Sequence, residues 1–145
     1  MKSEFSLSVQ YASEAQDIPK RHTFRKCVKA AVEMPCAITI RIVDLEEGLD
    51  LNRNFRGKDY ATNVLTFVYD DQEPLMGDIV ICAPVIAKEA SDQGKSLEEH
   101  YAHMTIHGAL HLQGYDHEEE EEAEKMETME KCILERLGYP DPYRV

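Results

Sequence analysis

Three histidines near the end of the chain restrict its local fold more than any other feature. They are His107, His111 and His117, and they follow the spacing His-x3-His-x5-His. Positions i and i+4 share one face of a helix, so His107 and His111 point the same way. Gly114 then allows the chain to leave the helix in a left-handed conformation, and this turn can return His117 to the same point. The spacing therefore predicts a helix that ends near residue 113 and is followed by a tight turn.

The converging histidines predict a metal site. Three imidazoles with one open coordination position are the ligand set of a catalytic zinc site, whereas structural zinc sites are closed by four protein ligands. We therefore expect about one Zn²⁺ per chain, bound by the three histidines, and the alternative is a histidine-rich helix end without metal. His103 lies one turn before His107, and we interpret it as a core residue or a neighbour of the ligands, since a fourth ligand would close the site. His100 and His22 are expected at the surface.

The same spacing matches the extended zinc-protease signature His-Glu-x-x-His-x-x-Gly-x-x-His, except that Gly108 replaces the Glu. In those proteases the Glu is the general base that takes a proton from water. Glycine has no side chain that could do this. The substitution favours metal chemistry on a substrate other than a peptide. A metallohydrolase of another class, such as a peptidase with its base elsewhere in the chain, is the alternative.

Several segments resemble one known family. Residues 107–117, His-Gly-Ala-Leu-His-Leu-Gln-Gly-Tyr-Asp-His, resemble the signature of the YbeY family of metal-dependent endoribonucleases. Residues 52–59 are similar to its Asn-x-x-Arg-Gly-Lys-Asp block, residues 62–67 to its Thr-Asp/Asn-Val-Leu-Ser-Phe block, and residues 77–82 to its Gly-Asp-Ile strand. The blocks occur in the family's order, and the resemblance covers most of the chain.

This resemblance implies a zinc-dependent, single-strand-directed endoribonuclease that acts in ribosomal RNA maturation and ribosome biogenesis. The implied partners are single-stranded RNA, ribosomal RNA and the ribosome or a ribosomal protein, and no DNA is expected. A zinc-binding ribosome-assembly factor without physiological cleavage is a second alternative, because a shared fold does not establish function. The nucleophile, water or the RNA 2′-hydroxyl, is left open.

Arg56 is the candidate catalytic residue. The family's Arg at this position is implicated in catalysis, and a guanidinium can hold a phosphate group bidentately. Positive charge directed at the phosphate oxygens favours phosphoryl transfer. The alternative for Arg56 is a surface ion pair with an acidic neighbour such as Asp59. Arg53 and Lys58 are candidate substrate-binding residues.

The charge of the chain is unevenly distributed. The net charge is −12, but residues 1–58 carry ten basic and eight acidic side chains, and residues 59–145 carry six and twenty. Affinity for a phosphate backbone normally comes from Lys and Arg, so RNA or ribosome contact is expected from the N-terminal half. The predicted first helix carries a basic face, which is either such a contact or simply solvated, formed by Lys20, Arg21, Arg25, Lys26 and Lys29.

Length and composition indicate one domain, residues 1–145. The chain has no run of eighteen apolar residues and no apolar segment at its N-terminus, so neither a membrane span nor a secretory signal is expected. The four cysteines are scattered and form no Cys-x-x-Cys pair. We therefore expect free thiols and a reducing, cytoplasmic location.

Hydrophobic periodicity predicts a mixed α/β domain whose β-sheet packs against helices, with the metal-binding helix near the C-terminus. Strands are expected at residues 5–11, 37–44, 64–68 and 78–82, and helices at residues 19–33, 45–55, 83–93, 97–113 and from about 116 to 137. The first two strands should be parallel because a helix joins them, and at least one antiparallel edge is expected where only a loop joins two strands.

Local signals predict how three of these helices begin. Ser96 and Glu99 form a capping box at the start of the histidine helix. Asp44 is expected to cap the second helix, and Asp116 to cap the last helix, with orientation of a histidine ligand as the alternative for Asp116. For the second helix, the apolar spacing predicts an inner face made of Leu45, Leu49, Asn52 and Phe55.

Overall fold

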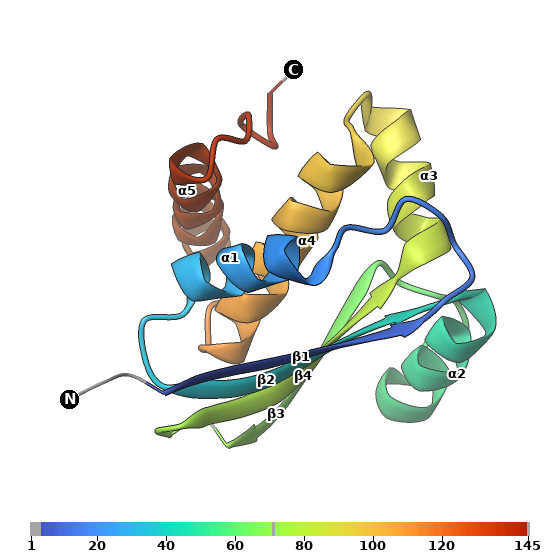
Figure 1. The fold of residues 1–145 in the computed structure, drawn as a ribbon, viewed down its shortest axis with the longest axis horizontal. Coiled ribbons are helices and arrows are strands. Elements are labelled where there is room, and N and C mark those ends of the chain that lie inside the picture. The colour runs from blue at the N-terminus through green and yellow to red at the C-terminus, as the bar shows by residue number, and fades with distance from the viewer. Residues whose placement is uncertain (1–3, 71, 145) are drawn as a thin grey trace.

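The computed structural model describes residues 4–70 and 72–144. Within these ranges a four-stranded sheet packs with five helices, which confirms the predicted mixed α/β domain (Figure 1). The strands are β1 (Phe5–Ala12), β2 (Cys36–Val43), β3 (Val64–Asp70) and β4 (Leu75–Cys82). The helices are α1 (Arg21–Ala31), α2 (Leu45–Arg56), α3 (Ala83–Gln93), α4 (Leu97–Leu112) and α5 (Glu120–Arg136).

The sheet has the strand order β1-β2-β4-β3. Strands β1 and β2 are parallel and in register from Phe5 opposite Cys36, and β2 is also parallel to β4. Strand β3 is antiparallel to β4 and forms an edge of the sheet. The predicted parallel pair and the predicted antiparallel edge are both confirmed, and the edge strand becomes one wall of the functional site.

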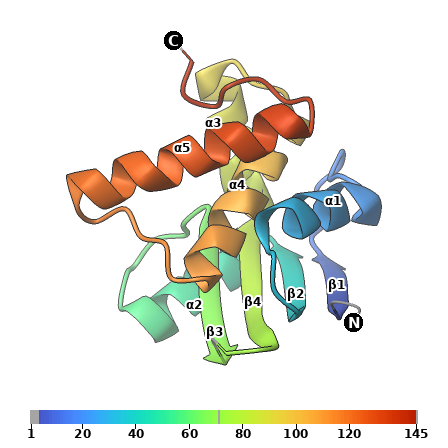
Figure 2. The same ribbon diagram turned by 90° about the vertical axis from the view of Figure 1, so that its left-hand side faces the viewer.

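Two cores cover the two faces of the sheet. Helices α1 and α4 pack on one face over buried residues such as Ile40 and Ile79, and α5 crosses the outer side of α4 (Figure 2). The opposite face carries a smaller apolar cluster around Val43 and Val80, next to Leu51 of α2. None of the helices in the described part of the chain is long and apolar enough to cross a membrane.

A glycine stands at each of two contact points between helix α4 and strand β4. A Cβ atom added to Gly108 would lie 3.0 Å from Cγ2 of Ile79, and one added to Gly77 would lie 2.8 Å from Cδ2 of Leu112. At its start α4 has the Ser96 half of the predicted capping box, since the Glu99 amide N–H donates to Oγ of Ser96 at 3.1 Å, whereas the Glu99 carboxylate accepts from Arg144 at 2.9 Å. Position 108 therefore faces the sheet, where a Glu side chain would not fit.

Asp44 occupies the predicted N-cap position of α2, but its carboxylate makes no capping hydrogen bond, and the prediction that Asp116 caps the last helix is wrong, because Glu119 is the N-cap of α5. Asp44 accepts hydrogen bonds from the hydroxyl of Ser13 and from the amide of Glu14. Asp116 accepts from the amide of His117 at 2.7 Å, and helix α5 begins at Glu120, later than the sequence predicts. Competing polar partners thus override a local propensity for capping.

The predicted inner face of α2 is also partly wrong. The helix is buried through Gly48 and Asn52, and the Asn52 amide donates to the carbonyl of Tyr60 at 2.6 Å. Leu45 and Phe55, at the two ends of the helix, are exposed. The narrow contact explains this outcome, because Gly48 brings the middle of the helix against Cys82 and the ends extend past it.

Candidate metal centre

Helix α4 and the turn after it bring His107, His111 and His117 together, as the spacing predicts. One ring nitrogen from each lies within 4.8 Å of the others, and Nε2 of His107 is 3.1 Å from Nε2 of His111. Gly114 provides the turn with a φ of +97°, in the left-handed region that favours glycine. This cluster could bind a metal ion.

A buried carboxylate from α5 orients one of these histidines. Nδ1–H of His107 donates to Oε2 of Glu130 at 2.6 Å, and Nε2–H of His103 donates to Oε1 at 2.7 Å. The Glu130 side chain is only 1% exposed, and the hydroxyl of Tyr143 also donates to it. With Nδ1 engaged in this way, the lone pair of His107 at Nε2 is directed toward His111, which is the usual arrangement around a metal-binding histidine.

The protonation states favour a metal site as well. Burial by itself would raise the pKa of Glu130, but hydrogen bonds and charges from His103 and His107 outweigh it and lower the pKa to about 2. Burial, followed by the neighbouring His107 and His117, lowers the pKa of His111. His111 is therefore neutral near pH 7, and the neutral imidazole is the form that binds a metal. Three imidazoles suit zinc, and also copper, iron and nickel.

The other histidines of α4 support the cluster from the interior. His103 is buried and held by Glu130, in agreement with its interpretation as a core residue or a neighbour of the ligands. The prediction that His100 lies at the surface is wrong: it is 2% exposed, and Nε2–H donates to Oε1 of Glu89 at 2.8 Å. Most of α4 is buried, so even its polar positions are covered. His22 is exposed as expected.

A cavity of about 810 Å³ opens at the β3 edge of the sheet. It is bounded by residues 62–67, by the histidines of α4, by Tyr143 and by the end of α2. Arg56, the last residue of α2, lines this cavity together with the three clustered histidines. The structure thus brings the candidate catalytic residue and the candidate metal ligands into one space.

Arg53 and Lys58 lie elsewhere. The guanidinium of Arg53 pairs with Asp59, with Nη2 and Oδ1 2.6 Å apart, so the acidic neighbour considered for Arg56 is bound by Arg53 instead. Arg53 and Lys58 are both outside the set of described residues that line the cavity. Their roles as substrate contacts stay predictions.

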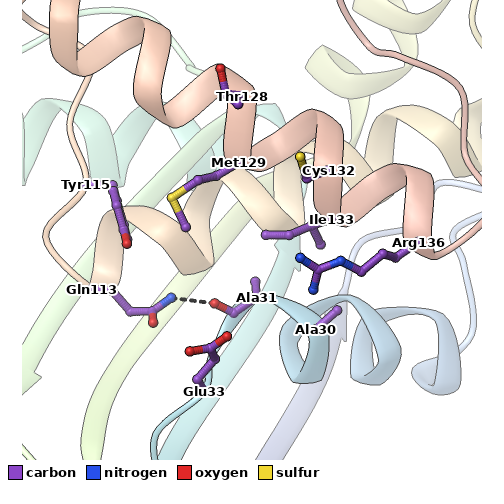
Figure 3. Close-up of a pocket in the computed structure, with 10 residues that line it drawn as sticks. All are labelled: Ala30, Ala31, Glu33, Gln113, Tyr115, Thr128, Met129, Cys132, Ile133 and Arg136. Carbon is purple, nitrogen blue, oxygen red and sulfur yellow. Dashed lines mark hydrogen bonds between the residues drawn. The ribbon is translucent and has the colours of Figure 1, made fainter.

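A second, smaller cavity of about 260 Å³ lies where α1 and α5 meet the end of α4 (Figure 3). Gln113 lines this cavity, and its side-chain amide donates to the carbonyl of Ala31 at 2.8 Å. Arg136 extends from α5 toward the same cavity (Figure 3). Among the described residues, the two cavities share no lining residue. The larger cavity is the candidate site, because it contains Arg56 and the three clustered histidines.

Two contributors to this site were missed in the sequence. Glu130 lies four residues after Met126 and three before Ile133, so it shares their buried face, and a carboxylate on an apolar stripe requires polar partners. The spacing of Glu130 relative to Met126 and Ile133 was therefore the sequence signal for a buried carboxylate. Tyr143 follows the last helix in an irregular segment, and no periodic pattern points to it.

Fold and site together define a mixed α/β protein with a tris-histidine cluster, able to bind a metal, at the edge of its sheet. The family model described as Endoribonuclease YbeY matches residues 7–138. The Endoribonuclease YbeY of Nitrosomonas europaea is 63% identical over 142 residues, which span 98% of this chain and 87% of that relative. The corresponding protein of Thiobacillus denitrificans is 54% identical over 145 residues, 99% of each chain. The chain belongs to the YbeY family, as its motifs predict.

One solved structure matches the fold. The solution structure of TM1509 from Thermotoga maritima has a TM-score of 0.55 and 24% identity, and the match covers 96% of this chain and 99% of that one. At this identity the match supports the fold only.

Proposed function

We propose that this chain is a zinc-dependent endoribonuclease that cleaves single-stranded RNA during ribosomal RNA maturation. The observation that carries the proposal is the shared cavity, in which Arg56 faces the same space as the histidine cluster. Membership of an endoribonuclease family supports RNA as the substrate. Zinc is proposed because three imidazoles that leave one position open are its usual catalytic ligand set.

In this proposal His107, His111 and His117 hold the ion. Bound zinc supplies Lewis acidity toward water and phosphate oxygens. Glu130 holds His107 in one tautomer and one orientation, so the ligand does not have to reorganise during the reaction. Arg56 binds the non-bridging oxygens of the scissile phosphate and stabilises the charge that develops on them.

Gly108 excludes a peptidase-type base at its position, because it has no side chain and a Cβ atom there would lie 3.0 Å from Cγ2 of Ile79. This argues against the zinc-protease mechanism, whereas membership of an endoribonuclease family is the support for RNA. The absence of a side chain at position 108 also lets α4 approach β4, so the same glycine serves the packing of the metal-binding helix.

The proposed partner is the ribosome or a ribosomal protein, contacted through the basic face of α1. Arg21 lies over the ring of Tyr11, and Arg25 lies over the ring of Phe5. These contacts hold both charges of α1 beside strand β1. The four cysteines, all within the described ranges, are free thiols, and this supports a reducing, cytoplasmic location.

The proposal is tested by comparing the unmodified chain with His111→Ala on a single-stranded ribosomal RNA fragment and on casein. We expect metal-dependent cleavage of RNA by the unmodified chain only, and no hydrolysis of casein by either. Cleavage of casein would favour a peptidase. Normal ribosome binding and RNA maturation in cells that contain only the His111→Ala chain would favour a ribosome-assembly factor.

A further inference from the structure

An exposed aromatic ring lies at the mouth of the cavity. Phe55 is 66% exposed, although the apolar pattern of α2 predicts that it is buried. Its ring meets that of Phe67 edge to face, with the centroids 5.2 Å apart and an angle of 73° between the planes. Both rings line the cavity that contains Arg56 and the histidine cluster.

The packing of α2 explains why this ring is exposed, but it gives the exposed ring no function. Helix α2 is held by Gly48 and Asn52, and Phe55 lies beyond that contact. A single exposed apolar residue is common on protein surfaces and needs no explanation. Phe55 differs because it lines the same cavity as Arg56, so a ring and a cation face one space.

We propose that Phe55, supported edge-on by Phe67, is a stacking platform for an unpaired base next to the phosphate held by Arg56. This inference rests on the proposed function. Stacking on aromatic rings beside cationic groups is how proteins bind single strands without reading their sequence, because every base has a π-face.

The charge of the chain strengthens this inference. With twenty acidic and six basic side chains in residues 59–145, the domain repels a phosphate backbone over much of its surface. Affinity for RNA at this cavity therefore needs a contribution that does not depend on charge, and stacking provides one. A platform of this kind also selects the strand, because a base inside a duplex is already stacked and paired and must be extruded to reach the ring.

The test measures binding of a short unstructured RNA to the full-length chain by fluorescence anisotropy, with EDTA present so that the RNA is not cut. A 2-aminopurine base in the RNA reports stacking by fluorescence quenching. We expect Phe55→Ala to weaken binding about 5- to 100-fold, from the effect of removing one base-stacking ring. Phe55→Trp should retain both affinity and quenching, and Phe55→Leu should lose both despite being apolar.

Tyr69→Ala is the matched control. Tyr69 is an equally exposed aromatic residue, at 66%, and lies on β3, but it is not among the described residues that line the cavity. Its substitution should leave RNA binding unchanged, and binding of a fully paired RNA should be the same in all variants.

The outcomes separate the two proposals. An unmodified chain that binds no single-stranded RNA would overturn the proposed function and the platform with it. If the unmodified chain binds RNA and Phe55→Ala binds it equally well, only the platform is overturned. Full binding by Phe55→Leu without quenching would also overturn the platform, because the residue would then serve as an apolar contact, as in docking of a protein.

Discussion

Replacing Glu130 by Gln tests how much the metal cluster depends on a residue that binds no metal in this account. Gln has nearly the same shape but one carbonyl oxygen in place of two carboxylate oxygens. Glu130 now accepts from Nδ1 of His107, Nε2 of His103 and the hydroxyl of Tyr143. A single amide oxygen cannot accept all three donors in the same geometry, so at least one histidine loses its partner.

The structure gives the expected size of the effect. Lowering the pKa of Glu130 from 4.5 to about 2 corresponds to about 3 kcal/mol of folded-state stability near neutral pH. Loss of a carboxylate that orients a metal-binding histidine typically lowers metal affinity about 10- to 100-fold. We therefore expect Glu130→Gln to lose roughly that much zinc affinity and up to about 3 kcal/mol of stability.

The stability effect has a defined dependence on pH. Because the folded-state pKa of Glu130 lies below its ordinary value of 4.5, its contribution is complete above about pH 5 and disappears as the pH falls toward 2. The difference in free energy of unfolding between the unmodified chain and Glu130→Gln should be largest near neutral pH and small near pH 2.

Urea unfolding of the metal-free chain measures the stability, and competition with a chelating dye measures the zinc affinity. Glu124→Gln is the control, because it removes the same charge from an exposed position on the same helix. If Glu130→Gln matched this control in both assays, the assigned role of Glu130 would be refuted.

Three further predictions concern catalysis and docking. Arg56→Lys should lower kcat about 10²-fold or more with normal zinc content, because a point charge cannot replace the guanidinium fork; single-turnover cleavage assays and metal analysis check this. Gly108→Glu should create no casein hydrolysis and should destabilise the chain by about 1–3 kcal/mol in thermal unfolding, because even its Cβ would lie 3.0 Å from Ile79. Reversing three charges at the start of α1 to Glu should weaken ribosome or RNA association in sedimentation assays more than reversing three charges of α5. The first set is Lys20, the residue before α1, with Arg21 and Arg25, and the second is Lys125, Lys131 and Arg136. Equal effects would contradict an N-terminal docking face.

The convergence of His107, His111 and His117 could be predicted because it depends on local geometry. Two of these residues are one helical turn apart, and the third follows a glycine whose backbone turns the chain back. The alternating and helical periods of the other segments likewise predicted each strand and helix, and most of their predicted ends differ from the observed ends by a few residues. Local patterns are read reliably when the neighbours in sequence are also the neighbours in space.

The residues that support the cluster could not be predicted in the same way. Glu130 meets His107 across 23 residues, and this contact exists only because α5 crosses α4. His100 is buried by the packing of whole helices, and Phe55 is exposed because α2 contacts the sheet through its middle. Asp44 shows the same effect, since Ser13, 31 residues away, takes the carboxylate that could have capped α2.

A zinc titration tests whether the tris-histidine cluster holds the metal on which RNA cleavage depends. The chain is stripped of metal with a chelator, zinc is added back in steps, and cleavage of single-stranded RNA is measured at each step. Activity should be absent in the stripped chain, rise with added zinc and level off near one zinc per chain. His103→Ala should follow the same curve, and His117→Ala should stay inactive. Full cleavage by the stripped chain, or a normal titration of His117→Ala, would contradict the account.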